Sequence, residues 1–115
     1  MARLIVSATA SPTFDNFIML VSVSSTDGKA TKGLKPGHFK IHHLSSLNHA
    51  SVLERVVTKA NEGPDGFYTL LLAPWEPQPN LPPGHYVFAV AVSWTPRRGA
   101  ETNHGQCVAV GDMPK

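Results

Sequence analysis

Six histidines are the side chains of this sequence with the clearest capacity for chemistry. They are His38, His42, His43, His49, His85 and His104. Zinc needs three or four ligand atoms at about 2.0–2.3 Å from the ion. Residues four apart on a strand lie about 13 Å apart along it, so His38 and His42 need a partner strand, or a loop residue such as His49, to close a site. We therefore expect solvent-facing histidines without a bound metal, and a histidine-centred metal site is an alternative.

The single cysteine, Cys107, follows His104 by three residues, a pairing that could supply a nucleophile and its base. Alternation along the strand places Cys107 on one face with Ala109 and places Val108 on the other, so we expect a small buried thiol that reacts slowly. The sequence contains no Gly-x-Ser-x-Gly, His-Glu-x-x-His, Gly-x-x-x-x-Gly-Lys or Gly-x-Gly-x-x-Gly motif. These observations predict a protein that is not an enzyme and that carries no cofactor.

Basic side chains concentrate in two segments that separate expected strands. The first segment carries Lys29, Lys32 and Lys35, and the second carries Trp94, Arg97 and Arg98. Lysines in loops are usually solvated and inert, but Trp and Arg are the residues most enriched at binding hot spots. We interpret these six residues as a partner-binding site, which would take an acidic partner, most simply another protein.

A second tryptophan, Trp75, lies in a stiff, proline-rich segment at residues 73–83, APWEPQPNLPP. Its ring could fold back over the core as a lid, and the segment offers no convincing free Pro-x-x-Pro ligand. A carbohydrate- or ligand-binding module that uses Trp75 or Trp94 as a stacking platform is therefore another alternative to protein binding.

Composition and charge limit the classes of function. The formal net charge of +2 is too small to indicate nucleic acid binding. One cysteine cannot form an internal disulfide, which excludes a disulfide-dependent secreted scaffold. The longest apolar stretches, residues 17–21 and 87–92, are too short to insert across a membrane, and residues 4–6 are too short for the apolar part of a signal peptide. We expect a soluble, cytoplasmic protein, whose oligomeric state the sequence leaves open.

Strand signals alternate with turn signals along the chain, which has the length of one all-β domain, residues 1–115. The expected strands span residues 3–9, 16–24, 38–43, 52–58, 67–73, 85–93 and 105–110. Turn sequences such as Pro64-Asp65-Gly66 separate them. Helical periodicity is weak throughout, because even residues 51–60 lack a wide apolar stripe.

Period-2 alternation identifies the side chains that face the core. The predicted core residues are Phe17, Met19, Val21, Phe39, Ile41, Tyr68, Leu70, Leu72, Tyr86, Phe88 and Val90. In the fifth strand the opposite assignment, with Phe67 and Leu71 inward, is an alternative, because both faces of this strand are apolar.

The segments at residues 65–74 (DGFYTLLLAP), 83–92 (PGHYVFAVAV) and 105–110 (GQCVAV) roughly follow the pattern D-G-x-Y, strand, P-x-x-x-G-x-Y, strand. This pattern resembles the last three strands of filamin-type and macroglobulin-type immunoglobulin-like domains. The resemblance implies a seven-stranded antiparallel immunoglobulin-like β-sandwich and implies nothing specific about function. In such a sandwich the two basic segments emerge at the same end, and Tyr86 would match the tyrosine corner.

Overall fold

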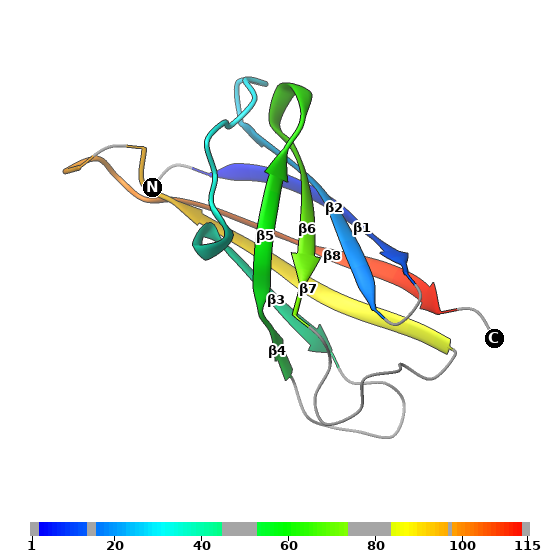
Figure 1. The fold of residues 1–115 in the computed structure, drawn as a ribbon. Coiled ribbons are helices and arrows are strands. Elements are labelled where there is room, and N and C mark those ends of the chain that lie inside the picture. Colours follow the sequence, from blue (N-terminus) through cyan, green and yellow to red (C-terminus); the bar gives the residue numbers. More distant parts are fainter. Residues whose placement is uncertain (1–2, 14–15, 45–52, 74–83, 97, 114–115) are drawn as a thin grey trace.

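The described part of the chain forms a sandwich of two antiparallel β-sheets (Figure 1), which confirms the all-β prediction. The computed structural model describes residues 3–13, 16–44, 53–73, 84–96 and 98–113. Its strands are β1 (Leu4–Pro12), β2 (Phe17–Ser25), β3 (Phe39–Leu44), β4 (Leu53–Arg55), β5 (Val57–Glu62), β6 (Phe67–Leu72), β7 (Gly84–Trp94) and β8 (Asn103–Met113). Two 3₁₀ turns, η1 (Pro36–His38) and η2 (Pro64–Gly66), precede β3 and β6. Within these residues, no helix has the length and apolar character needed to cross a membrane.

One expected strand, residues 52–58, is divided between the two sheets. The first sheet has the strand order β1-β2-β6-β5 and the second has the order β4-β3-β7-β8. β4 pairs with β3 and β5 pairs with β6, and Val56 alone separates them. The seven expected extended segments therefore appear as eight strands, because alternation along a segment does not reveal that its pairing partner changes midway.

β1 and β8 both extend beyond the predicted residues 3–9 and 105–110. β1 pairs with β2 from Leu4 to Pro12, and β8 pairs with β7 from Asn103 to Met113. The prediction stopped early because the ends of these strands contain small or polar residues, which give no alternating apolar signal. At these ends, backbone hydrogen bonds to the long partner strand continue the β-ladder, and such bonds do not require alternating apolar side chains.

The apolar core lies between the two sheets, as alternation predicts. All eleven predicted core residues are buried, and Phe67 is 57% exposed, which excludes the alternative assignment of its strand. Phe17 from the first sheet packs against Tyr86 and Phe88 from the second, with ring centroids 5.2 Å and 5.4 Å apart. Aromatic pairs at this separation add to the energy of burial, so this cluster holds the two sheets together.

β1 and β8 belong to different sheets and run side by side at one edge of the sandwich (Figure 1). Two glycines of β8 permit this approach. A Cβ atom on Gly105 would lie 2.5 Å from the carbonyl oxygen of Leu4, and one on Gly111 would lie 2.7 Å from that of Ala10. The backbone of β1 therefore occupies the space that side chains at these positions would need, and the sandwich is closed along this edge.

Candidate functional site

The loop between β2 and β3, residues 26–35, begins with a turn fixed by local hydrogen bonds. Gly28, with φ of 88°, donates its N–H to the carbonyl of Ser25 (2.9 Å), and Ser25 donates its N–H to the carbonyl of Lys29 (2.9 Å). The carboxylate of Asp27 accepts from the Ser25 hydroxyl and from the Lys29 N–H, and these bonds lower the pKa of Asp27. Glycine suits the left-handed conformation at position 28 because it has no Cβ.

The hydroxyl of Tyr68 holds the second half of this loop against the first sheet. It accepts the N–H of Leu34 (3.2 Å) and donates to the carbonyl of Thr31 (2.7 Å). Burial raises the pKa of Tyr68, so the hydroxyl stays protonated and can donate. Sequence reasoning assigned Tyr68 only to the core, since the strand pattern contains no signal for a bond to a loop that lies more than thirty residues earlier in the chain.

This anchoring makes the three predicted lysines project into solvent. Thr31 and Leu34 are buried, whereas Lys29, Lys32 and Lys35 are exposed. The loop backbone is therefore ordered by Thr31 and Leu34, which lie between the lysines in the sequence, and the lysine side chains remain at the surface. A loop that is already ordered loses less conformational entropy when it binds a partner.

Acidic side chains lie at the same end of the sandwich and reduce its positive charge. Asp27 belongs to the turn described above, and Glu62 accepts the N–H of Gly33 (3.1 Å). Glu101, in the second loop, is exposed. The sequence analysis named only the cations of this end and did not consider these acidic side chains.

The loop between β7 and β8, residues 95–102, carries the second predicted set. The Thr95 and Thr102 hydroxyls share a hydrogen bond (2.7 Å) that continues the β7–β8 hairpin beyond the paired strands. Arg98 is exposed near the tip of the loop. Trp94 is half-buried and packs against the core, so only part of its ring is available to a partner.

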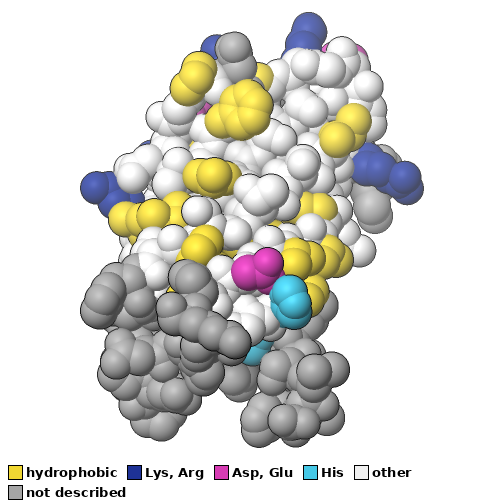
Figure 2. All heavy atoms as spheres, turned by 90° about the vertical axis from the view of Figure 1, so that its right-hand side faces the viewer, with side chains coloured by type: hydrophobic (Ala, Val, Ile, Leu, Met, Phe, Trp, Pro, Cys, Tyr) yellow, Lys and Arg dark blue, Asp and Glu magenta, His cyan; other side chains and the backbone are white. Residues whose placement is uncertain are grey.

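The loop at residues 26–35 lies next to the turn between β5 and β6, whereas the loop at residues 95–102 projects from the ends of β7 and β8 in another direction (Figure 1). Figure 2 shows Lys and Arg side chains at the upper margin and sides of one face, with hydrophobic side chains across the middle. On this face the Lys and Arg side chains are spread along the margins and do not form one compact cluster.

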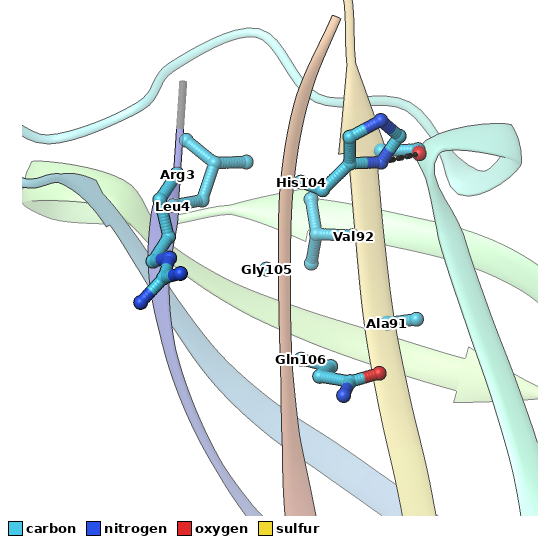
Figure 3. A pocket seen from close by; sticks show the side chains of 8 residues that line it. Arg3, Leu4, Ala91, Val92, His104, Gly105 and Gln106 are labelled. Carbon is cyan, nitrogen blue, oxygen red and sulfur yellow. Dashed lines mark hydrogen bonds between the residues drawn. The ribbon is translucent and has the colours of Figure 1, made fainter. Parts of the chain in front are cut away.

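An open hollow of about 470 Å³ lies along β8 where β1 passes beside it (Figure 3). Arg3 lines it from the position just before β1, and His104 and Gln106 line it from β8. A hydrogen bond between Nδ1 of His104 and the hydroxyl of Ser93 (2.8 Å) orients the imidazole. The Arg3 guanidinium lies on the β1 side of the hollow and the His104 imidazole lies on the β7 side, with β8 between them. Each group can donate a hydrogen bond to a carboxylate. Sequence analysis did not detect this hollow, because Arg3 and His104 come from opposite ends of the chain and meet only through a parallel β-bridge.

The described histidines do not converge on a metal site. Nδ1 of His38 accepts a backbone N–H at the start of η1 (2.9 Å). His85 pairs with Asp112 across β7 and β8, and His104 lies near the other end of β8 with Ser93. Among the residues that the structure describes, no group of three or more His, Cys, Asp and Glu side chains could hold a metal ion.

His43 contradicts the expectation that the histidines face solvent. It points inward from β3, is 9% exposed, and lies against the rings of Tyr86 and Phe88, with centroids 5.4 Å and 5.5 Å away. Burial, followed by the positive charge of Arg55, lowers the pKa of His43. Arg55 is itself buried and donates from Nη2 to the carbonyl of Ala73 (2.9 Å). Alternation along β3 already contained the signal for His43, because every second side chain of that strand faces the core.

Cys107 and His104 do not form a nucleophile and base. His104 is exposed on the outer face of β8, whereas Cys107 is half-buried and packs against the core on the inner face. Burial raises the pKa of the Cys107 thiol, which keeps the reactive thiolate scarce at neutral pH. The alternation of Cys107 with Val108 is as predicted, although the thiol is only half-buried.

Three residues singled out from the sequence, Trp75, Arg97 and His49, lie outside the described residues. The predicted partner-binding set is therefore described at Lys29, Lys32, Lys35, Trp94 and Arg98. Comparison of the chain with protein-family models, with curated proteins and with solved structures finds no match.

Proposed function

We propose that this protein is a non-enzymatic binding module that recognises an acidic surface of another protein. The binding surface is the end of the sandwich that carries the two basic loops, and we call it the basic end. Its residues are Lys29, Lys32, Lys35, Trp94, Arg97 and Arg98. Electrostatic attraction at such a surface mainly accelerates association and suppresses partners of the wrong charge.

The proposal includes assignment to the immunoglobulin-like class. The strand order β1-β2-β6-β5 facing β4-β3-β7-β8 corresponds to strands A-B-E-D facing C′-C-F-G of that class. The loops 26–35 and 95–102 then take the places of the B–C and F–G loops, which many domains of this architecture use for recognition. The same architecture hosts many functions, so the choice of function depends on the surface of the loops.

One observation carries the proposal: the lysines project from a loop whose backbone is held in place from within. The Tyr68 hydroxyl bonds to Leu34 and Thr31 tie the loop to the first sheet, while Lys32 and Lys35 stay exposed. Lysines that only interact with solvent could lie on a mobile loop, without hydrogen bonds that fix the loop backbone. An ordered array of cations can match a fixed pattern of carboxylates on a protein surface.

A direct test is the binding of a fluorescent oligoglutamate peptide, with oligoglutamine of the same length as the neutral counterpart. The variant Lys32→Glu with Lys35→Glu should weaken binding at low salt by about tenfold or more, because two attractive contacts become repulsive. The matched control, Lys40→Glu with Lys59→Glu, makes the same charge change at exposed positions on the strands and should have little effect. Equal loss in both variants would show that net charge alone controls binding and would contradict the proposal.

The second loop is tested by Arg97→Glu with Arg98→Glu. This change should weaken binding of the same peptide and leave the melting temperature nearly unchanged, because charged side chains in loops usually contribute little to folding. Higher ionic strength should weaken binding of the unmodified protein, since the Debye length is about 8 Å at physiological salt. Unchanged affinity of the variant at low salt would remove this loop from the interface.

Carbohydrate binding remains the alternative function, and it requires an exposed aromatic platform. Trp94 is half-buried against the core, so little of the ring is free to stack on a sugar. Titration with oligosaccharides while tryptophan fluorescence is recorded separates the two functions. Saturable quenching by a glycan, without binding of the acidic peptide, would favour the carbohydrate module.

A further inference from the structure

The outer face of β7 and β8 is apolar along most of its length. The outward-facing pairs at its two ends are His85–Asp112 and Ser93–His104. The outward positions between these pairs are Val87, Ala89, Ala91, Gln106, Val108 and Val110. None of these six side chains is charged, and Val108 and Val110 are 58% and 55% exposed. The outer face of an antiparallel sheet is normally polar when it meets water, and a continuous exposed apolar patch marks an interaction surface.

The two ends of this face carry complementary groups. At one end the carboxylate of Asp112 is exposed beside His85. At the other end lies the hollow, which Arg3 lines from the β1 side and His104 and Gln106 line from β8. No acidic side chain among the described residues forms an ion pair with Arg3. β8 therefore has the exposed Asp112 carboxylate at one end and, eight residues away, exposed His104 beside exposed Arg3 at the other.

We propose that two copies of this chain associate through this face. A twofold axis across the strands at Val108 would place the two β8 strands antiparallel, with the sheets stacked on each other. Val108 then meets Val108 of the second copy, and Val110 meets its Gln106. The Asp112 carboxylate of each copy reaches the hollow formed by Arg3 and His104 of the other, so the contact is self-complementary, as a twofold interface must be.

The area available indicates a weak, reversible dimer. The stretch from His104 to Asp112 is about 26 Å long, and β7 and β8 together with the shorter β3 are about 14 Å wide at standard β spacings, so each copy would bury at most about 400 Å². The total of about 800 Å² lies below the range of stable complexes and within that of transient ones. The small side chains Ala89 and Ala91 allow the two sheets to approach closely. An unrelated protein would have to reproduce the eight-residue spacing of acid and hollow, which a second copy has by symmetry.

Sedimentation velocity over a wide range of protein concentration tests the dimer. The unmodified protein should show a monomer–dimer equilibrium, and Val108→Glu should raise the dissociation constant by about tenfold or more by burying like charges against each other. Leu20→Glu is the matched control, because Leu20 is an exposed apolar residue on the outer face of the other sheet. Circular dichroism verifies that both variants are folded. A protein that is monomeric at every concentration, or a dimer that Val108→Glu leaves intact, overturns the proposal.

A charge exchange tests the contact between Asp112 and Arg3. Arg3→Glu and Asp112→Arg should each raise the dissociation constant, and the two changes combined in one chain should restore it, since the twofold axis then joins the exchanged partners. Losses that simply add in the double variant overturn this geometry. The double variant Lys32→Glu with Lys35→Glu should leave the dissociation constant of the dimer unchanged. Sedimentation therefore tests the dimer, peptide binding tests the basic end, and either proposal can fail without the other.

Discussion

At the scale of single residues, a polar group in the core orders a loop at the surface. The Tyr68 hydroxyl lies in the core and bonds both Leu34 and Thr31 of the lysine-bearing loop. A buried donor or acceptor that loses its partner carries the cost of its desolvation. The order of the loop therefore depends on one oxygen atom of a side chain that also packs in the core.

Removal of this oxygen in Tyr68→Phe should destabilise the protein by about 1–3 kcal/mol, because the Leu34 N–H loses its acceptor in a buried position. The loop should also open more often. Urea unfolding measures the first effect, and amide hydrogen exchange at Leu34 measures the second. Unchanged exchange at Leu34 would contradict the role of the hydroxyl, even if stability fell.

His43 places a titratable ring inside the core. The aromatic rings of Tyr86 and Phe88 contact it, and Arg55 from β4 is the charged group that faces it among the described residues. Burial and the charge of Arg55 lower its pKa in the folded protein. The unfolded chain therefore binds the proton more tightly, and the stability due to neutral His43 is present above the unfolded pKa of about 6.5 and is lost as the pH falls from there toward the folded pKa.

We expect the free energy of unfolding to decrease between pH 7.5 and pH 5.5, with a contribution from His43 of at most about 1.4 kcal/mol per pH unit. His43→Leu removes the titrating group and should flatten this part of the profile. His42→Ala, on the outer face of the same strand, is the control and should leave the slope unchanged. Urea midpoints at each pH measure the effect, and equal slopes in all three proteins would contradict it.

At the scale of elements, the contact between β1 and β8 depends on two glycines. The Leu4 carbonyl lies against Gly105, and the Ala10 carbonyl lies against Gly111. The same contact brings Arg3 beside β8 and so creates the hollow. Closure of the sandwich and formation of the candidate carboxylate site are therefore two results of one strand arrangement.

Gly105→Ala and Gly111→Ala should each destabilise the fold by about 1–3 kcal/mol, because the new methyl group meets backbone that cannot move without shifting β1. Gly37→Ala is the control, since a Cβ atom there would meet no atom within 4 Å. Thermal or urea unfolding of the three variants measures the difference. If Gly105→Ala is as stable as Gly37→Ala, β1 does not lie as close to β8 as the structure places it.

At the scale of the whole molecule, the two sheets are joined by side chains from strands that are distant in the sequence. Phe17 from β2 meets Tyr86 and Phe88 from β7, so this aromatic cluster depends on the complete sandwich. Neither sheet can bury these rings without the other. Loss of one ring should therefore weaken the whole fold and not one edge of it.

Phe88→Ala should destabilise the protein by about 3–5 kcal/mol through lost burial and the cavity that remains. Phe67→Ala removes the same side chain from a position that is 57% exposed and should change stability far less. Urea denaturation followed by both fluorescence and circular dichroism measures the two variants. A similar, small loss in both would mean that the inner face of β7 is wrongly assigned.

The sequence by itself determined where most strands lie and which of their side chains face the core. Period-2 alternation is a local property, so Phe17, Met19 and Val21 could be assigned inward from β2 alone, and the structure buries all three. The same alternation predicted that Cys107 and Val108 face opposite sides of β8. It also contained the signal for a buried His43, which was missed because histidine is usually exposed.

The tertiary structure alone decided which distant segments meet. The division of residues 52–58 between two sheets depends on the choice of β3 and β6 as partners. The hollow depends on the β-bridge between Arg3 and His104, which come from opposite ends of the chain. The placement of the Glu62 carboxylate beside the lysine-bearing loop depends on its hydrogen bond to Gly33. Local patterns cannot specify these contacts, because pairing between remote segments is set by the packing of the whole core and by backbone hydrogen bonds that any side chain permits.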